Sequence, residues 1–163
     1  MKLFIFLFTV ISLQSIDLQQ IRIAYKETVQ DKSKVVQFNK QLSLVSKSSK
    51  PELVAYKGAS IALVARKAKT IKEKKSGFLK GIALVEYAIK KTPNNIEARF
   101  VRLSIQENTP KLLKYKENIT EDKQFIYKQF PLIKNTSLKK YLKAYILQSK
   151  AFSDEEKSVI SKS

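Results

Sequence analysis

Glycine is scarce in this chain, and that scarcity constrains the fold more than any other feature of the sequence. The 163 residues include only three glycines and four prolines. A protein built from many short strands needs turns rich in glycine and proline, so this composition argues against an all-β fold. Apolar residues instead recur at intervals of three and four along most of the length, which is the period of an amphipathic helix. The sequence therefore predicts an all-α protein.

Helix-capping residues and prolines divide this periodic sequence into seven to nine predicted helices joined by short loops. The predicted helices cover residues 17–30 and 31–45 (one bent helix or two), 50–68, 78–91, 94–105, a helix capped by Thr109 with Pro110 first, 120–130, 136–146 and 153–163. Short loops favour antiparallel neighbours, so we expect stacked helical hairpins. The last helix, at 153–163, is short enough to fray.

A positively charged tip followed by about ten apolar residues opens the chain, at residues 1–13. This is the pattern of a secretory signal peptide, and it is shorter than the roughly 20 apolar residues of a membrane-spanning helix. We therefore expect residues 1–15 to be removed on export to the periplasm or the outside of the cell, leaving residues 16–163 as one domain. The alternative is a retained signal anchor, because Leu13 is not the small residue expected three positions before a cut after Ser15.

Histidine and cysteine are both absent from the sequence. Imidazole bases, cysteine nucleophiles, disulfides and thiolate or imidazole metal sites are therefore unavailable, and we predict no cofactor and no metal. The carboxylates that remain for catalysis, the pair Glu121–Asp122 and the run at 154–156, stand at predicted helix starts, where capping explains them. We predict that the protein is not an enzyme and rank a carboxylate-dependent hydrolase below a binding function.

The chain is strongly basic, with 32 Lys and Arg against 14 Asp and Glu and a net charge of +18. Such a charge attracts anions, including nucleic acid, acidic lipid and anionic polysaccharide. Nucleic-acid readers rely on the bidentate guanidinium of arginine, however, and here 28 of the 32 cations are lysine. We therefore do not expect a nucleic-acid partner.

A cluster of cations falls between two predicted helices, where the sequence predicts a linker closed by Ser76 and Gly77. One interpretation is a basic surface that contacts acidic lipid or polysaccharide, since lysines near a charged surface each add about 1 kcal/mol. The other, which we prefer, is an ordinary solvated connection. The candidate basic surface consists of Arg66, Lys67, Lys69, Lys72, Lys74 and Lys75.

Two of the four arginines, Arg99 and Arg102, lie three residues apart on one predicted helix face. Glu86 is embedded in the apolar helix before them and is their natural partner. The preferred interpretation is a structural ion-pair cluster that fixes two helices in register. The alternative is a pocket in which the arginines hold a carboxylate or phosphate of a ligand. Other side chains expected nearby are Glu97, Gln106, Tyr56 and Tyr87.

Gly81, Val85, Ala88 and Pro93 follow the small, bulky, small and proline pattern of a tetratricopeptide unit, which this stretch resembles over about one helix and its exit. The next helix departs from that pattern at Arg99 and the residues after it. The resemblance implies an irregular, tetratricopeptide-like stack of hairpins.

Two longer segments resemble uncharacterised small exported helical proteins: Tyr-Lys-Gly-Ala at 56–59 and Pro-Asn-Asn-Ile-Glu-Ala-Arg-Phe-Val-Arg-Leu at 93–103. No activity comes with that likeness. Helical-hairpin arrays often present a binding face to a protein or peptide, so we predict an exported, non-catalytic protein- or peptide-binding module. The alternative is a lysine-rich anion-binding protein of the cell envelope.

Overall fold

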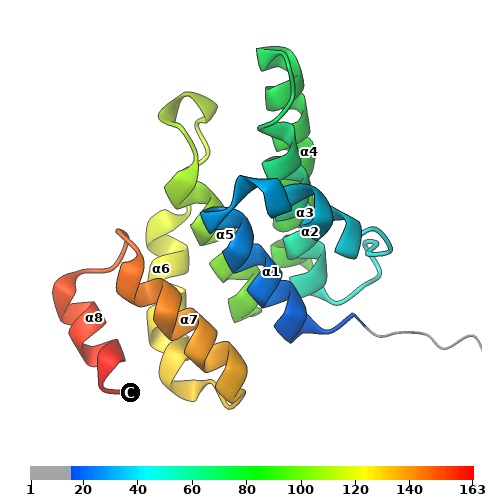
Figure 1. The fold of residues 1–163 in the computed structure, drawn as a ribbon. Coiled ribbons are helices and arrows are strands. Elements are labelled where there is room, and N and C mark those ends of the chain that lie inside the picture. The colour runs from blue at the N-terminus through cyan, green and yellow to red at the C-terminus, as the bar shows by residue number, and fades with distance from the viewer. Residues whose placement is uncertain (1–15) are drawn as a thin grey trace, which may run out of the picture.

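The computed structural model describes residues 16–163, and the predicted signal segment 1–15 lies outside the described residues. Within residues 16–163 the chain forms eight α-helices, three short 3-10 turns and no strand, so the prediction of an all-α fold is confirmed. The helices pack in pairs (Figure 1). They are α1 (Leu18–Gln30), α2 (Val35–Gln41), α3 (Pro51–Ala65), α4 (Ile71–Lys91), α5 (Ile96–Asn108), α6 (Ile119–Gln129), α7 (Thr136–Gln148) and α8 (Asp154–Ser161), with 3-10 turns at Lys32–Lys34, Lys111–Leu113 and Phe130–Leu132.

The longest hairpin is formed by α3 and α4, and its tip projects from the body of the molecule (Figure 1). The two helices cross at Gly58 and Gly81, where a Cβ atom added to either residue would lie 2.5 Å from the carbonyl oxygen of the other. No side chain fits in that space, so glycine at both positions lets the two backbones approach each other closely. The glycines thus determine how tightly the hairpin is closed.

Helix α5 lies at the centre of the fold, in contact with α3, α4 and α6. Both its apolar and its charged faces are buried, since Phe100, Leu103, Arg99 and Arg102 are all at most 9% exposed. The ring of Phe100 makes edge-to-face contacts with tyrosines of α1 and α7. Because a buried charge is costly unless it is paired, α5 requires carboxylate and guanidinium partners on the helices around it.

The α3–α4 connection differs from the predicted linker, because α4 begins at Ile71 and not at Phe78. Thr70 and Glu73 form a capping box in which each side chain accepts from the backbone N–H of the other. This Thr-x-x-Glu signal was present in the sequence. The first turns of α4 are nevertheless exposed all round, so the apolar period that marks a buried helix is missing there. Helix α3 ends at Ala65, slightly before the predicted end.

Two other predicted helix starts are wrong. The N-cap of α5 is Asn95, whose side chain accepts from the backbone N–H of Ala98, and not Asn94. Thr109 caps the C-terminus of α5 instead of starting a new helix, and only the 3-10 turn Lys111–Leu113 follows it. Lys114 then adopts a left-handed conformation with φ of 48°, which prevents the turn from continuing as a helix.

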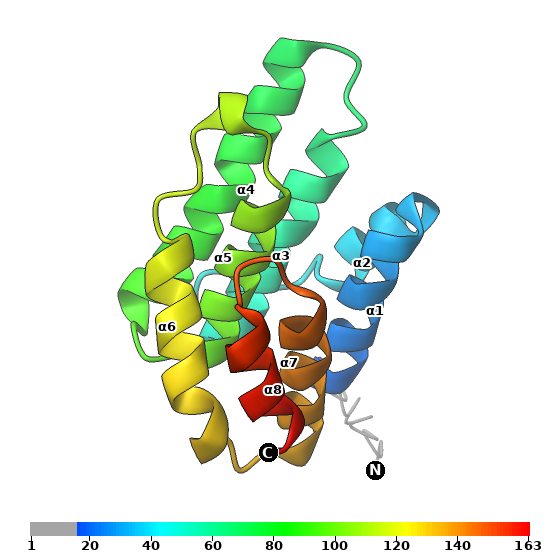
Figure 2. The same cartoon turned by 90° about the vertical axis from the view of Figure 1, so that its left-hand side faces the viewer.

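The C-terminal helix α8 packs against α7 at the end opposite the hairpin tip (Figure 2). Ser153 and Glu156 form the predicted capping box. Ile160 is 1% exposed, and the Glu156 carboxylate also pairs with the Lys123 ammonium at 2.8 Å. The helix is therefore docked by an apolar contact and an ion pair.

Candidate functional site

The carboxylate of Asp122, in the first turn of α6, is the centre of a buried ion-pair network. Its side chain is fully buried. It accepts from Arg99 Nη1 at 2.9 Å and from Arg102 Nε and Nη2 at 2.6 and 2.8 Å. A buried carboxylate is tolerated only when charge and hydrogen bonds compensate for its lost hydration, and two guanidinium groups do so here. The network joins α5 to α6.

Both guanidinium groups also donate to further protein acceptors. Arg99 donates to the carbonyl of Pro93 at 2.6 Å and to Glu121 at 2.7 Å, and Arg102 donates to Glu86 at 2.9 Å. The hydrogen bond from Arg99 lowers the pKa of the Glu121 carboxyl. Burial alone would lower the pKa of Arg102, but its hydrogen bond to Asp122 and the charge of that carboxylate outweigh burial, and the pKa is raised. The network therefore favours the charged forms of Glu121 and Arg102.

The predicted contact between Glu86 and the arginine pair is present, through Arg102. Two other parts of the prediction differ from the structure. Glu97 belongs to a separate network, and the Gln106 amide donates to Asn118 at 3.3 Å. Asp122, for which the sequence predicts helix capping, is instead the carboxylate that both arginines share. Because protein acceptors occupy both guanidinium groups, the geometry favours the structural interpretation over the ligand pocket.

A second buried network, which the sequence analysis did not anticipate, connects α1, α3 and α5. Arg22 donates from Nε and Nη2 to the two carboxylate oxygens of Glu97 at 2.7 and 2.8 Å. The hydroxyl of Tyr56 donates to the same carboxylate at 2.9 Å. The hydrogen bond to Glu97 raises the pKa of Arg22, and burial raises the pKa of Tyr56. The available signal was that Arg22 is one of only four arginines in a lysine-rich chain.

The two tyrosines expected to line one pocket therefore lie apart. Tyr56 is fully buried in the Arg22–Glu97 network. The ring of Tyr87, on α4, lies 4.9 Å from the ammonium of Lys47 in a cation–π contact. Neither tyrosine forms a site with Arg99 and Arg102.

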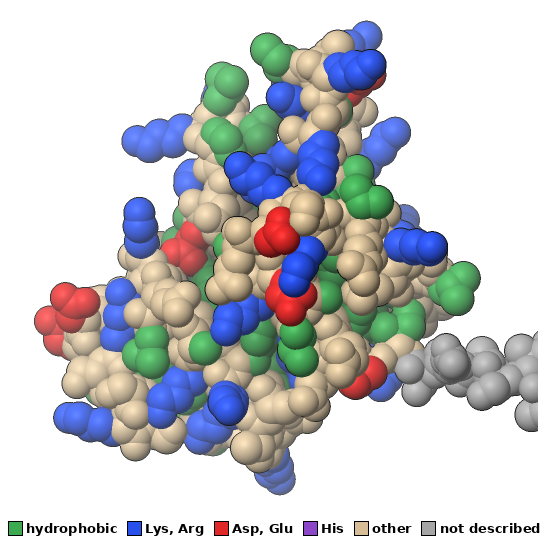
Figure 3. Space-filling view, viewed as in Figure 1, with side chains coloured by type: hydrophobic (Ala, Val, Ile, Leu, Met, Phe, Trp, Pro, Cys, Tyr) green, Lys and Arg blue, Asp and Glu red, His purple; other side chains and the backbone are tan. Residues whose placement is uncertain are grey.

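The six residues of the predicted basic surface are exposed cations, but they do not form a linker. Arg66, Lys67 and Lys69 lie in the α3–α4 connection, whereas Lys72, Lys74 and Lys75 lie in the first turns of α4. All six residues are exposed. Figure 3 shows Lys and Arg side chains around the projecting hairpin tip. Three of the six cations thus lie on a helix and not in a loop.

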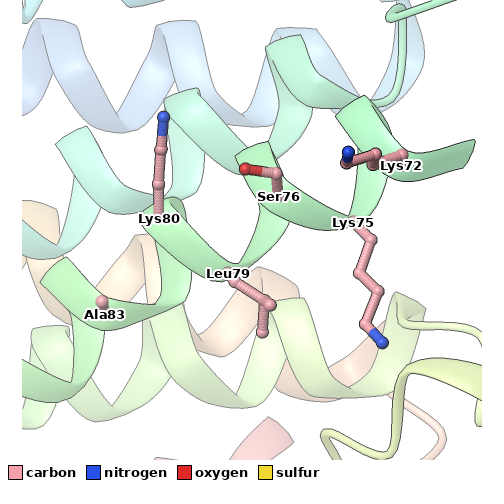
Figure 4. Close-up of a pocket in the computed structure, with 6 residues that line it drawn as sticks. All are labelled: Lys72, Lys75, Ser76, Leu79, Lys80 and Ala83. Atoms are coloured by element: carbon pink, nitrogen blue, oxygen red, sulfur yellow. The ribbon is translucent and has the colours of Figure 1, made fainter. Parts of the chain in front are cut away.

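An open hollow of about 520 Å³ lies along the outward face of α4 (Figure 4). Leu79, which is 48% exposed, and Ala83 give it an apolar floor, and lysine side chains flank that floor. We call this surface the outer α4 face. Its residues are Lys72, Lys75, Ser76, Leu79, Lys80 and Ala83.

Nothing within α4 neutralises the lysines of this face. The helix contains two carboxylates, of which Glu73 accepts from Thr70 and Glu86 accepts from Arg102 and the Tyr115 hydroxyl. In the described residues the only lysine ion pairs are those of Lys34 and Lys123, in other parts of the molecule. The outer α4 face therefore combines unpaired positive charge with a narrow apolar strip.

Residues 16–163 contain neither a candidate membrane span nor a candidate metal site. No described helix is both long enough and apolar enough to cross a membrane. Among the same residues, no group of three or more acidic side chains is placed to hold a metal ion.

No family model, no curated protein and no solved structure matches this chain. The class of the molecule is therefore defined by its own geometry: a basic, all-α protein of paired helices with a projecting hairpin. Its buried arginines are paired within the protein, whereas the exposed lysines on α4 have no carboxylate partner among residues 16–163. These two properties are the basis for the function proposed below.

Proposed function

We propose that the protein is an exported, non-catalytic binding module that holds a segment of another protein along the outer α4 face. One observation carries this proposal: the face joins an apolar floor at Leu79 and Ala83 to lysines that have no carboxylate partner among the described residues. A helical face of this kind suits a peptide or helix that supplies apolar side chains at intervals of three and four.

Charge complementarity indicates the chemistry of the partner. Lys72, Lys75 and Lys80 flank the apolar strip, so the segment that fits carries Asp or Glu on both sides of an apolar residue. The small side chains of Ser76 and Ala83 allow close approach. An acidic amphipathic segment is therefore the proposed occupant.

The interior of the protein supports a binding role over a catalytic one. Arg99 and Arg102 are engaged by protein acceptors. The hydroxyls of Ser60 and Ser104 each donate to a backbone carbonyl at 2.8 Å, which leaves neither oriented by a base as a nucleophile requires.

Site-directed cross-linking tests the proposal. The chain has no cysteine, so Leu79→Cys introduces a single thiol for a benzophenone label, and Leu147→Cys provides the matched control because Leu147 is 40% exposed on α7. After illumination in an extract of the source envelope, we expect a protein adduct from position 79 and none from position 147. The cross-linked peptide is expected to be acidic, and adding Lys75→Glu and Lys80→Glu should abolish the adduct.

Three results would contradict the proposal: equal adducts at both positions, a cross-linked peptide without acidic residues, or an adduct that survives the charge reversal. Far-ultraviolet circular dichroism of each labelled variant shows that a lost adduct does not reflect a lost fold.

A further inference from the structure

A second surface, at the end of the molecule rather than along the side of α4, carries a separate inference. The α3–α4 connection and the 109–118 loop project at the same end (Figures 1 and 2). Tyr115 ties the loop to α4, because its ring packs edge-on against Phe78 with centroids 5.8 Å apart and its hydroxyl donates to Glu86. The two projections are thus held beside each other by buried and half-buried contacts.

Each projection carries one strongly exposed apolar side chain near its end. Ile71, at the start of α4, is 81% exposed, and Leu112, in the 3-10 turn, is 87% exposed. Figure 3 shows apolar side chains at the end of each projection, with Lys and Arg side chains around them. Transfer of these two large aliphatic side chains from water into an apolar phase would be favourable.

The surroundings of these two residues are basic. Residues 66–75 contain six cations and one carboxylate, that of Glu73, which is occupied by the Thr70 cap. The loop adds Lys111 and Lys114, both exposed. We call residues 66–75 and 110–114 together the basic end.

We propose that the basic end docks on an anionic phospholipid surface, with Ile71 and Leu112 entering the interface and the surrounding lysines contacting acidic headgroups. Charge complementarity selects an anionic partner, and the two apolar ends select a lipid surface over a soluble polyanion, which has no apolar phase to offer. The two surfaces share Lys72 and Lys75, whereas Ser76, Leu79, Lys80 and Ala83 of the outer α4 face lie outside the basic end.

Vesicle co-sedimentation of the full chain tests this inference, with equimolar phosphatidylglycerol and phosphatidylcholine against phosphatidylcholine alone. We expect binding that needs the acidic lipid and weakens with added salt, because the Debye length shortens from about 10 Å at 0.1 M to about 3 Å at 1 M. Lys67→Gln with Lys69→Gln should weaken binding roughly fivefold per charge removed. Leu112→Ser should weaken it by roughly fivefold to tenfold.

The opposite end of the molecule provides matched controls. Leu132 is 69% exposed in another 3-10 turn, and the exposed Lys128 and Lys134 lie near it. Leu132→Ser, and Lys128→Gln with Lys134→Gln, should leave vesicle binding unchanged. All variants retain residues 1–15, so differences between them report on the substituted positions alone.

Equal losses from the two leucine substitutions would overturn the inference, as would binding that does not need the acidic lipid. Binding of soluble polyglutamate that competes fully with vesicles and is unaffected by Leu112→Ser would also overturn it, in favour of a purely electrostatic polyanion site. The cross-linking at position 79 is independent of all these outcomes.

Discussion

Around α5, buried arginines contact carboxylates from neighbouring helices, whereas along α4 exposed lysines have no carboxylate partner in the described residues. The difference follows from the solvent. In the interior a guanidinium with several fixed donors can satisfy a buried carboxylate, but at the surface water hydrates an ammonium and no partner is needed. Paired interior charges hold the fold, and unpaired surface charges are free to bind other molecules.

Removing the shared buried carboxylate is expected to have the largest effect. Asp122→Asn removes the buried carboxylate that two guanidinium groups share and leaves them only the half-exposed Glu121 and Glu86, so we expect a loss of about 3–5 kcal/mol in the free energy of unfolding. The matched control is Glu121→Gln on the adjacent, 54% exposed side chain, which should cost at most about 1 kcal/mol. Urea unfolding followed by circular dichroism measures both. Equal losses would mean that the interior and the surface do not differ as described.

Ionising a buried tyrosine tests the interior in another way. Burial raises the pKa of Tyr25 from 10.0 to about 12. The neutral form is favoured in the folded state, so this contribution is complete below pH 10 and is lost as the pH rises from 10 to about 12, by about 3 kcal/mol in total. Urea unfolding at a series of alkaline pH values measures the fall. Tyr25→Phe should make the fall shallower, and an unchanged fall in this variant would contradict the assignment to Tyr25.

Disturbing the close contact between α3 and α4 should have an intermediate effect on stability. Gly81→Ala places a Cβ atom against the Gly58 carbonyl oxygen, and we expect overpacking to cost about 1–3 kcal/mol. In an ordinary helix the same substitution would stabilise by up to about 1 kcal/mol. The sign of the change in thermal midpoint therefore distinguishes overpacking from a gain in helix propensity. Ala83→Gly, on the exposed face of the same helix, measures the contribution of helix propensity alone.

The smallest effect on stability is expected from the exposed lysines of α4. Lys72→Gln and Lys80→Gln should each change the free energy of unfolding by no more than about 0.5 kcal/mol. Their effect should fall on binding instead, as a weaker and less salt-dependent interaction with an acidic peptide. A large loss of stability from either variant would show that these cations have a structural role after all.

The parts of the fold that could be predicted from the sequence are those with a clear apolar stripe. Helix α7 is an example, since Leu142 and Ile146 are fully buried on the predicted face. The first turns of α4 were missed because they contact nothing that an apolar period would reveal, although Thr70 and Glu73 carried the capping signal. The capping residues therefore mark the start of α4, which the apolar periodicity does not.

The arginine cluster was half predictable for a similar reason. Glu86 could be paired with Arg102 because they lie on consecutive helices. Asp122 and the Arg22–Glu97 pair depend on how distant helices are brought together, since Arg22 and Glu97 are 75 positions apart in the sequence. Asp122 also stands near the start of a helix, where capping alone explains a carboxylate. Tertiary packing, rather than helix propensity, decides such pairs.

The unequal lengths of α3 and α4 have one further consequence. Helix α4 has 21 residues and α3 has 15, so residues 71–76 extend past the partner helix and are exposed on every side, whereas Val85 and Ala88 are at most 1% exposed. One continuous helix thereby spans the range from fraying backbone to the most protected part of the core. Backbone amides along α4 should exchange with deuterium in a graded order, fastest beside Thr70 and slowest beside Val85, so that the end that meets other molecules can unwind while the rest of the helix stays closed.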